Sequence, residues 1–417
     1  MNQPSLAADT DAAPISTSTR YDILDALRGF ALFGIFFANV QFFAGWLFLD
    51  ANAKDSIEGA VIYDAFMLMV IDGRFYTIFS FLFGLGFALQ LSRLQNKVAA
   101  KANLLYLRRL SILLLISLIH LCVFWIGDIL LLYAVLGFVL FFMRNCTDRS
   151  LLVTAALLFL LPIPGYYLFW KLGIDPSLGL YQVVSNWVDG SNDISGFFAG
   201  FYETVHTTSI IRYFELNMEI AIGRLGYYFD TWRIPKVLGI MLIGMWAGRQ
   251  LIAGKLLENA ALLKKAILFG LLVGLPSTVI YAKLSGLNSF QAHSAEGFLS
   301  VIAYMLAVFP LAFAYIALFT LLWRKHKSLL SVFAAPGRMA LSNYLLQTFF
   351  GIGIFYGVGF GLHLQGAPWS LVAIAILIFI LQVVISHLWL KGFMYGPAEW
   401  IWRMLTYGKL LPIKRLR

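Results

Sequence analysis

The chain has 417 residues, of which 60% are apolar, 16% aromatic and 12% charged, and its formal net charge is +10. Soluble domains carry about a quarter charged residues, so this chain has too few charges to cover a soluble surface. Together with a mean hydropathy of +0.81, this composition excludes a soluble globular protein, a disordered chain and a nucleic-acid-binding domain. The two cysteines, Cys122 and Cys146, exclude a disulfide framework and a cysteine zinc site.

Residues 1–24 are predicted to be a disordered cytoplasmic tail, because 1–20 is polar and lacks the basic and apolar segments of a signal peptide. We expect 25–417 to form a single all-α transmembrane domain. A spanning helix needs about 20 apolar residues. Ten runs approach that length: 29–49, 75–92, 108–126, 129–143, 151–170, 237–253, 265–282, 298–322, 340–361 and 369–390. The runs at 108–126 and 129–143 are predicted to pair as a hairpin that turns at Gly127-Asp128.

Lys and Arg residues gather in alternate loops, which orients the spans. With the N-terminus inside, 23 of the 31 basic residues fall on the cytoplasmic side. This split predicts an even number of spans and cytoplasmic N- and C-termini. The basic C-terminal segment also suits contact with anionic membrane lipids.

Two segments are expected on the outer side. Residues 50–73 combine five acidic residues with an apolar stripe, which predicts an interfacial helix. Residues 171–236 form the longest loop, and loops of this length usually contain helices of their own and often have a functional role.

The first group of ionisable residues lies at the start of the first span. Asp25 and Arg28 are three residues apart on a helical turn, so they can pair. Asn39 follows eleven residues after Arg28, about three turns along the same helix. One interpretation is a helix cap with a positive-inside anchor and an interhelical hydrogen bond. The other is an arginine that binds a phosphate at the cytosolic mouth of a cavity.

The second group is His120 in the third span and Asp128 at its outer end, with Tyr133 nearby on the fourth span. A straight helix would place His120 and Asp128 about 12 Å apart, on nearly one face, so that both can line a shared polar cavity. Histidine is suited to general-base catalysis near neutral pH. The alternative is an interhelical hydrogen bond for His120 and a turn position for Asp128.

Two further groups occur near the C-terminus. The ninth span opens with a polar cluster that is too dense for a lipid-facing surface, so it is expected to face the bundle or a substrate: Arg338, Ser342, Asn343 and Gln347. Residues 396–403 contain two tryptophans beside Arg403, which predicts an interfacial helix. There is no nucleotide-binding Gly-rich loop ending in Gly-Lys-Ser/Thr. The six histidines show no metal-ligand spacing, so no metal site is predicted.

Four motifs, in this order, resemble the YeiB family of bacterial inner-membrane proteins, whose domain has no assigned function. They are Asp25-Ala-Leu-Arg28-Gly29 leading to Asn39, His120-x7-Asp128-Ile-Leu-x2-Tyr133, Gly337-Arg338-Met-Ala-Leu-x-Asn343-Tyr344-Leu-x-Gln347, and Gly396-Pro397-x-Glu399-Trp400-x-Trp402-Arg403. The resemblance extends from about Asp22 to Tyr407. It implies the fold and the location.

A more distant similarity is to the transmembrane acyltransferase superfamily, which includes bacterial O-antigen acyltransferases and the lysosomal acetyltransferase of terminal glucosamine. These enzymes pass an acyl group from cytosolic acyl-CoA to an acceptor across the membrane. The first span carries the similarity: Arg28 followed by Asn39, where the O-antigen group has His and the lysosomal pattern has Asn. The lysosomal pattern adds a His just after this span. This sequence has none between Asn39 and Phe75, so that part would fall to His120.

The leading hypothesis is therefore an acyltransferase-like membrane protein, with acyl-CoA as donor and a glycan or lipid as acceptor. His120 would be the general base, Asp128 would orient it or the acceptor, and Asn39 would donate a hydrogen bond to the acyl carbonyl oxygen. The residues assigned to acyl-CoA or substrate binding are Arg28, Asp25, Tyr133, Arg338, Ser342, Asn343 and Gln347.

The alternative is a secondary transporter or lipid flippase in which His120 and Asp128 relay protons and the glycine-rich spans rock against each other. A non-catalytic membrane scaffold is a third class. The sequence alone does not choose among the three.

Overall fold

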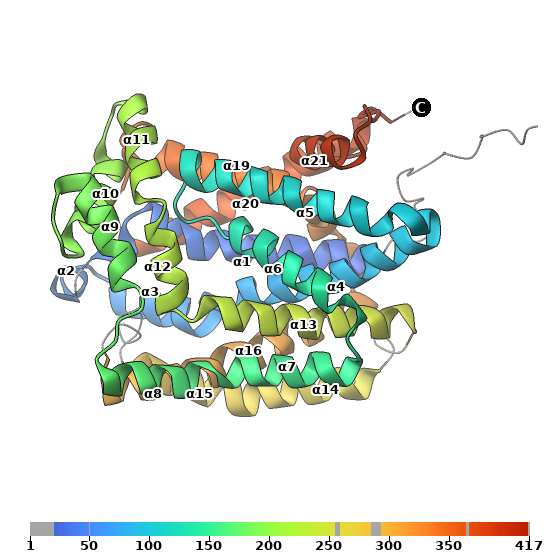
Figure 1. Cartoon of the computed structure of the whole chain (residues 1–417), viewed down its shortest axis with the longest axis horizontal. Coiled ribbons are helices and arrows are strands. Elements are labelled where there is room, and N and C mark those ends of the chain that lie inside the picture. Colours follow the sequence, from blue (N-terminus) through green and yellow to red (C-terminus); the bar gives the residue numbers. More distant parts are fainter. Residues whose placement is uncertain (1–20, 50, 255–258, 285–292, 364–366, 416–417) are drawn as a thin grey trace, which may run out of the picture.

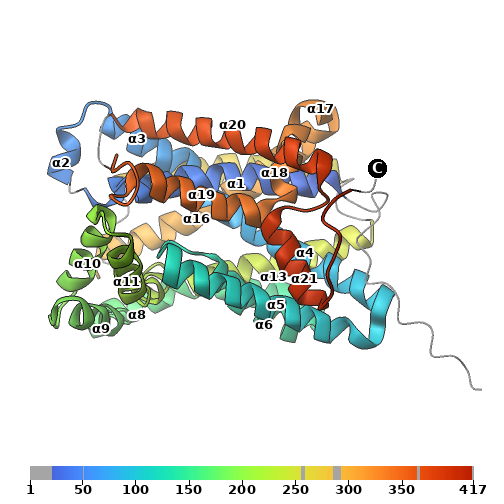
Figure 2. The same ribbon diagram turned by 90° about the horizontal axis from the view of Figure 1, so that it is seen from above.

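The computed structural model describes residues 21–415 except 50, 255–258, 285–292 and 364–366. The predicted tail at 1–24 thus lies mostly outside the described residues, and the first helix begins at Asp22. The described part of the chain is all-α, with a single isolated β-bridge between Phe393 and Lys414. Its long helices run roughly along one axis (Figure 1). Helices α2 and α9–α11 gather at one end, and α21 and the C-terminus lie at the other (Figure 2).

The helices that carry the bundle and its two ends have the following bounds: α1 Asp22–Phe43, α2 Ala51–Asp55, α3 Ala60–Phe66, α4 Arg74–Val98, α5 Ala102–Ile119, α6 Leu130–Phe142, α7 Asp148–Leu160, α8 Pro162–Leu172, α9 Leu178–Asp189, α10 Ser195–His206, α11 Ile210–Ile220, α12 Gly223–Asp230, α13 Arg233–Ile252, α14 Ala260–Phe269, α15 Leu275–Lys283, α16 Ala295–Lys325, α17 Lys327–Leu330, α18 Ala334–Arg338, α19 Ala340–Phe355, α20 Pro368–Gly392 and α21 Pro397–Tyr407. Three π-helical turns extend or join them, over Met67–Ile71, His120–Phe124 and Gly270–Gly274.

Six helical stretches of the described chain are long and apolar enough to cross a bilayer: Asp22–Phe43, Ala60–Phe124, Asp148–Leu172, Ala260–Lys283, Ala295–Lys325 and Pro368–Gly392. Leu130–Asn145 and Ala340–Phe355 are shorter apolar helices. This architecture is that of a multi-pass membrane protein. Each predicted apolar run overlaps a helix or a pair of consecutive helices. Helix α13, which covers the run at 237–253, is not among the stretches that are long and apolar enough to cross a bilayer.

Three predicted segments differ in detail. The helix predicted over 50–73 is two short helices and a π turn, because Gly59 adopts φ +80 between α2 and α3. The first span ends at Phe43 instead of Leu49, where a 3₁₀ turn begins at Trp46. The ninth ends at Phe355, and the chain folds back so that the amide of Phe360 donates to the carbonyl of Gly353 (2.8 Å).

The helices expected in the long loop at 171–236 are present as α9–α12, which gather at one end of the bundle (Figure 1). Of these four helices, α11 begins with a side-chain cap, whereas α9, α10 and α12 have none. Ser209 accepts a hydrogen bond from the amide of Arg212 at the start of α11. The loop is therefore an ordered layer above the predicted spans.

Two helix pairs pack backbone against backbone. A Cβ atom at Gly84 would lie 1.9 Å from the carbonyl oxygen of Met241, and one at Gly244 would lie 2.1 Å from that of Phe81, so α4 and α13 touch along their length. In the same way, Gly29 and Gly337 bring α1 against the segment ending in α18. Small residues permit this approach, which is common between membrane helices.

Candidate functional site

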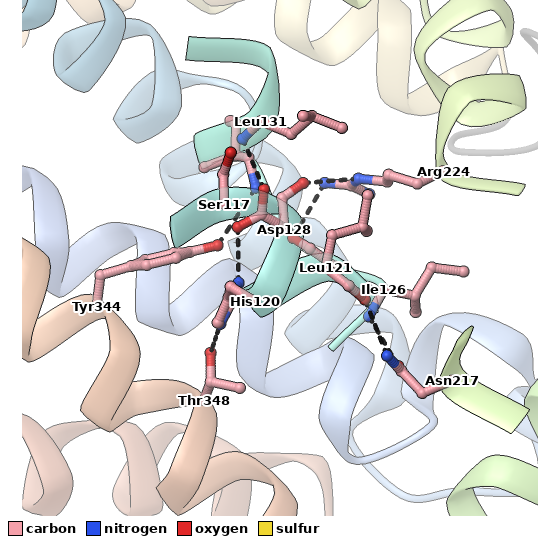
Figure 3. Close-up of polar contacts among 12 residues, drawn as sticks. Ser117, His120, Leu121, Ile126, Asp128, Leu131, Asn217, Arg224, Tyr344 and Thr348 are labelled. Carbon is pink, nitrogen blue, oxygen red and sulfur yellow. Dashed lines mark hydrogen bonds and ion pairs between the residues drawn. The ribbon is translucent and has the colours of Figure 1, made fainter. Parts of the chain in front are cut away.

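The centre of the candidate site is a contact between His120 and Asp128, which the sequence places eight residues apart. Helix α5 ends in the π turn at His120–Phe124, and the chain then reverses into α6. This reversal returns Asp128 to His120, so that Nδ1 of His120 lies 2.6 Å from Oδ2 of Asp128 (Figure 3). The helix is thus not straight, and the separation of about 12 Å expected for a straight helix does not apply. π turns often occur at functional sites.

A threonine completes this arrangement from a distant part of the chain. Oγ1 of Thr348, on α19, lies 3.0 Å from Nε2 of His120, on the side opposite Asp128 (Figure 3). The ring of Tyr344, one turn earlier on α19, is 5.3 Å from the His120 ring. His120, Asp128 and Thr348 are all at least 98% buried, which closes the site to solvent.

The turn that carries Asp128 is held by α11 and α12, two helices of the long loop. Arg224 of α12 donates to the carbonyls of Asp128 (2.8 Å) and Gly127 (3.1 Å), and the hydroxyl of Tyr228 also donates to Asp128 O (2.8 Å). Asn217 of α11 donates to the carbonyl of Leu121 and accepts from the amide of Ile126. The second carboxylate oxygen of Asp128 accepts from the amide of Leu131 at the start of α6 (2.7 Å). The turn is thus held by hydrogen bonds from α6, α11 and α12.

These contacts define the chemistry of His120. A carboxylate only accepts hydrogen bonds, so an ionised Asp128 requires the proton of neutral His120 to be on Nδ1. Nε2 then presents its lone pair to the hydroxyl of Thr348. A hydroxyl, an imidazole and a carboxylate in this order are the arrangement that activates a hydroxyl for attack on an acyl group.

Asn39 and Tyr133 lie on elements that flank this centre. Asn39 is partly buried on α1, between Leu32, which packs with Tyr344, and Phe43, whose ring stacks on Trp125 at 4.2 Å. Tyr133 faces α4 instead, where its hydroxyl lies 2.8 Å from that of Ser80 and donates to the carbonyl of Tyr76.

The pairing expected between Asp25 and Arg28 is present: Nη1 of Arg28 donates to Oδ1 of Asp25 at 2.8 Å, at the inner end of α1. Arg28 and Arg403 lie close enough to Arg109 to repel its charge, and Arg109 stacks on Trp402 (3.6 Å). Three arginines therefore converge at the end of the bundle where α21 lies. From the sequence, Arg109 was predicted only as one of the basic residues that orient the spans, and Arg403 also as part of an interfacial helix.

The polar residues that open α19 make contacts between helices. Asn343 donates to Ser386 of α20 (3.0 Å), and Gln347 donates to Gln382 of α20 (3.0 Å) and to the carbonyl of Leu32 of α1 (3.3 Å). These side chains bind α19 to α20 and α1. Arg338 closes α18, beside Gly337 and the first turns of α1.

Ser342 binds Glu399, which was predicted only as part of an interfacial helix. The Glu399 carboxylate accepts from the amides of Leu341 (2.7 Å) and Ser342 (3.1 Å) and from the Ser342 hydroxyl (2.5 Å). Burial raises the pKa of the Glu399 carboxyl, although these hydrogen bonds oppose the shift. Glu399 thus caps α19 from α21.

Among the described residues, no group of three or more His, Cys, Asp and Glu side chains is placed to hold a metal ion. The sequence analysis missed Thr348, Arg224 and Asn217. Threonine in a span is common and carries no signal of its own. Arg224 does carry a signal, because it lies in a segment predicted to be on the outer side, where basic residues are few.

The fold and this site define a multi-pass α-helical membrane protein with a buried His–Asp–Thr centre. The chain belongs to the family described as "Protein of unknown function (DUF418)", whose family model matches residues 247–409. It is 32% identical to the uncharacterised protein YxaH of Bacillus subtilis over 419 residues, which cover 96% of this chain and 98% of that protein.

It is also 28% identical to the uncharacterised protein YeiB of Escherichia coli over 416 residues, which cover 92% of this chain and 95% of that protein. An uncharacterised 39.9 kDa protein of Bacillus acidopullulyticus is likewise 28% identical, with 96% of this chain and 97% of that protein covered. The resemblance to the YeiB family is thereby confirmed. No solved structure matches the chain.

Proposed function

We propose that this protein is an acyltransferase of the bacterial inner membrane, with ten spans and cytoplasmic termini. It transfers an acyl group from cytosolic acyl-CoA to a hydroxyl or amine of a glycan or lipid acceptor. The observation that carries this proposal is the placement of His120 between the Asp128 carboxylate and the Thr348 hydroxyl. The family names carry no activity, so the proposal depends on this geometry and on the distant similarity of the first span.

In the proposed reaction, Nε2 of His120 takes the proton of the acceptor hydroxyl as its oxygen attacks the thioester carbonyl. The carbon–sulfur bond then breaks, and the imidazolium returns the proton to the leaving thiolate, which departs as free CoA thiol. Asp128 stabilises the imidazolium and fixes its tautomer. The Thr348 hydroxyl occupies the position at which the acceptor hydroxyl would bind.

The inner arginines supply the donor's binding site in this scheme. Arg28, Arg109 and Arg403 offer guanidinium groups to the phosphates of acyl-CoA, together with Arg338 nearby. Arg28 and Asn39 are eleven residues apart on α1, which is about 16 Å along the helix. An extended pantetheine arm covers a comparable length, so the thioester would reach the level of Asn39.

One observation favours the alternative, a proton-coupled transporter: the His120–Asp128 pair is closed to solvent. Buried ionisable pairs within membrane helices are typical of proton relays. The two functions differ in what they consume. An acyltransferase releases CoA thiol, whereas a transporter moves solute or protons across a sealed vesicle and releases none.

The test is thiol release by the purified protein with acetyl-CoA and short-chain acyl-CoAs, against a panel of glycans and lipids. His120→Ala should slow release about 10²–10⁴-fold, as for loss of a general base. His387→Ala is the matched control, because His387 is exposed and bonds only the carbonyl of Val383 among the described contacts. Absence of thiol release with every donor, alongside His120-dependent proton flux in vesicles, would refute acyl transfer and support the relay.

A further inference from the structure

A second polar cluster lies at the outer end of α4 and α13, apart from His120. It contains three basic side chains, Arg74, Arg233 and Lys236, and one carboxylate, Asp72. Arg74 and Lys236 are 1% and 2% exposed, and all three cations interact electrostatically with Asp72. The cluster thus contains three basic side chains and one acidic side chain, so basic groups are in excess.

The hydrogen bonds that Arg74 donates within the described chain are all to uncharged groups. Arg74 donates to the carbonyls of Leu68 and Asp72 (both 2.5 Å) and to the hydroxyl of Thr278 (2.8 Å), and its buried Nε has no hydrogen-bond partner among the described residues. Oδ2 of Asp72 is likewise buried without a partner in the described chain. Uncompensated buried charge is costly, so the cluster is built to receive a further group.

Tyrosines form the walls of the cluster. Arg233 lies over the ring of Tyr76 (4.1 Å) and donates to the hydroxyl of Tyr227 (2.8 Å). Lys236 lies over the ring of Tyr304 (4.3 Å), whose hydroxyl is 3.3 Å from that of Tyr76. The cluster thus combines cations with phenolic hydroxyls, which can donate to an anionic oxygen.

The helix directions add to this positive field. Arg74 is the first residue of α4 and Arg233 is the first residue of α13. Gly244 packs against Phe81 and Gly248 packs against Leu85, so the two helices run parallel and nearly in register. Their positive N-terminal ends therefore lie side by side at the cluster, an arrangement that favours an anion.

We propose that Arg74, Arg233 and Lys236 form an outer binding site for a phosphate group, with Asp72 accepting from a neighbouring hydroxyl of the same ligand. Asp72 and Arg233 are only partly buried and mark the side from which the ligand enters. Tyr228 connects this site to the first one, since it donates to Asp128 O and interacts electrostatically with Arg233. Use of the site to dock an acidic acceptor rests on the acyl transfer proposed above, whereas phosphate binding does not.

The test uses the full chain in phosphatidylcholine nanodiscs. The probes are inorganic phosphate, glycerol 3-phosphate and nanodiscs that contain phosphatidylglycerol, with binding measured by calorimetry and by the shift in thermal unfolding. Arg233→Gln and Lys236→Met should weaken binding about tenfold or more, as for loss of one charge-assisted hydrogen bond. Arg212→Gln and Lys171→Met are matched controls, because both residues lie on the outer helices away from the cluster.

Tyr304→Phe provides a milder variant that keeps every charge and should also weaken binding. Saturable binding of a soluble probe, lost in the cluster variants, supports a free phosphate ester as the ligand. Binding restricted to phosphatidylglycerol supports a lipid headgroup. The absence of saturable binding to all three probes, or equal binding by Tyr304→Phe and the native chain, would overturn the site. Thiol release measured on the same variants reports separately on acyl transfer.

Discussion

The carboxylate of Asp128 and the imidazole of His120 are in hydrogen-bond contact at 2.6 Å, across a chain reversal that α12 fixes through Arg224. Asp128 is fully buried, and its other oxygen accepts from the amide of Leu131. The turn is therefore held from both sides, and the orientation of His120 depends on a carboxylate that has no freedom to move.

Asp128→Asn should lower the rate of thiol release about 10²–10⁴-fold while the protein still folds. The amide is of similar size but cannot stabilise an imidazolium, and it permits the wrong tautomer of His120. Measurement of the rate against pH checks this expectation. Asp175→Asn, in the outer loop before α9, is the control. A rate equal to that of the native protein would show that Asp128 only closes the turn.

Thr348→Ser and Thr348→Val should separate two roles of the hydroxyl. If Thr348 only fills the position of the acceptor hydroxyl, as proposed, the Val variant stays active and forms no acyl-protein. Mass spectrometry of the protein after incubation with acyl-CoA alone checks this. An acyl group on Thr348, together with inactivity of the Val variant and activity of the Ser variant, would instead make Thr348 a nucleophile.

Arg28→Ala should reduce the folded yield or the affinity for acyl-CoA, because it leaves Asp25, which is 4% exposed, without its arginine at the start of a membrane helix. Arg28→Lys should restore only part of the affinity, since lysine cannot make a two-pronged contact with phosphate. Lys97→Ala, an exposed inner-side change, is the control. Unchanged yield and unchanged acyl-CoA binding would show that Arg28 serves only to orient the first span in the membrane.

Glu399 gives a pH-dependent prediction. Burial raises the pKa of its carboxyl in the folded protein, so the folded state holds this proton more tightly than the unfolded state does. The resulting stabilisation is full below the unfolded pKa and is lost as pH rises through the raised pKa. The difference in thermal midpoint between the native protein and Glu399→Gln should therefore shrink, or reverse, from pH 4 to pH 8.

Glu296→Gln serves as the reference for that experiment, because Glu296 is exposed on the first turn of α16. A difference between the native protein and Glu399→Gln that stays constant with pH would contradict the pKa shift. Loss of the three hydrogen bonds in Glu399→Ala should lower the midpoint at every pH, since the start of α19 then lacks its cap.

The predicted orientation places both termini in the cytoplasm. Fusion of alkaline phosphatase to either end should therefore give no periplasmic activity, and fusion after α10 should give activity. Activity at either terminus would overturn the even number of spans and, with it, the assignment of Arg28 to the donor side.

The apolar runs predicted the helices of the bundle because burial in lipid requires long apolar segments, and this requirement is visible in composition. The outer helices followed from loop length. The His120–Asp128 contact was not predictable as a direct bond, because it depends on a π turn and a reversal that no residue pattern specifies. Thr348 lies 228 residues from His120, so only the packing of α19 against α5 brings it there.

The outer phosphate site was missed for a different reason. Arg74, Arg233 and Lys236 each stand next to an apolar run, where a basic residue is expected to mark the membrane boundary. One feature of the sequence could have indicated a binding role. All three lie on the predicted outer side, which has only 8 of the 31 basic residues. Two of them, Arg74 and Lys236, are almost fully buried, which only the packing of α4 against α13 reveals.

The glycine contacts also determine which parts of the bundle can move. A backbone pressed against a carbonyl at Gly84 or Gly337 leaves no room for sliding, so α4 with α13, and α1 with α18, each behave as a rigid body. At His120 and Thr348, the contact between α19 and the π turn that ends α5 is a hydrogen bond between side chains and not a close backbone contact. A substrate that enters between these two helices would replace the Thr348 hydroxyl with its own. Entry of the substrate and exposure of the His120 imidazole would then be the same event.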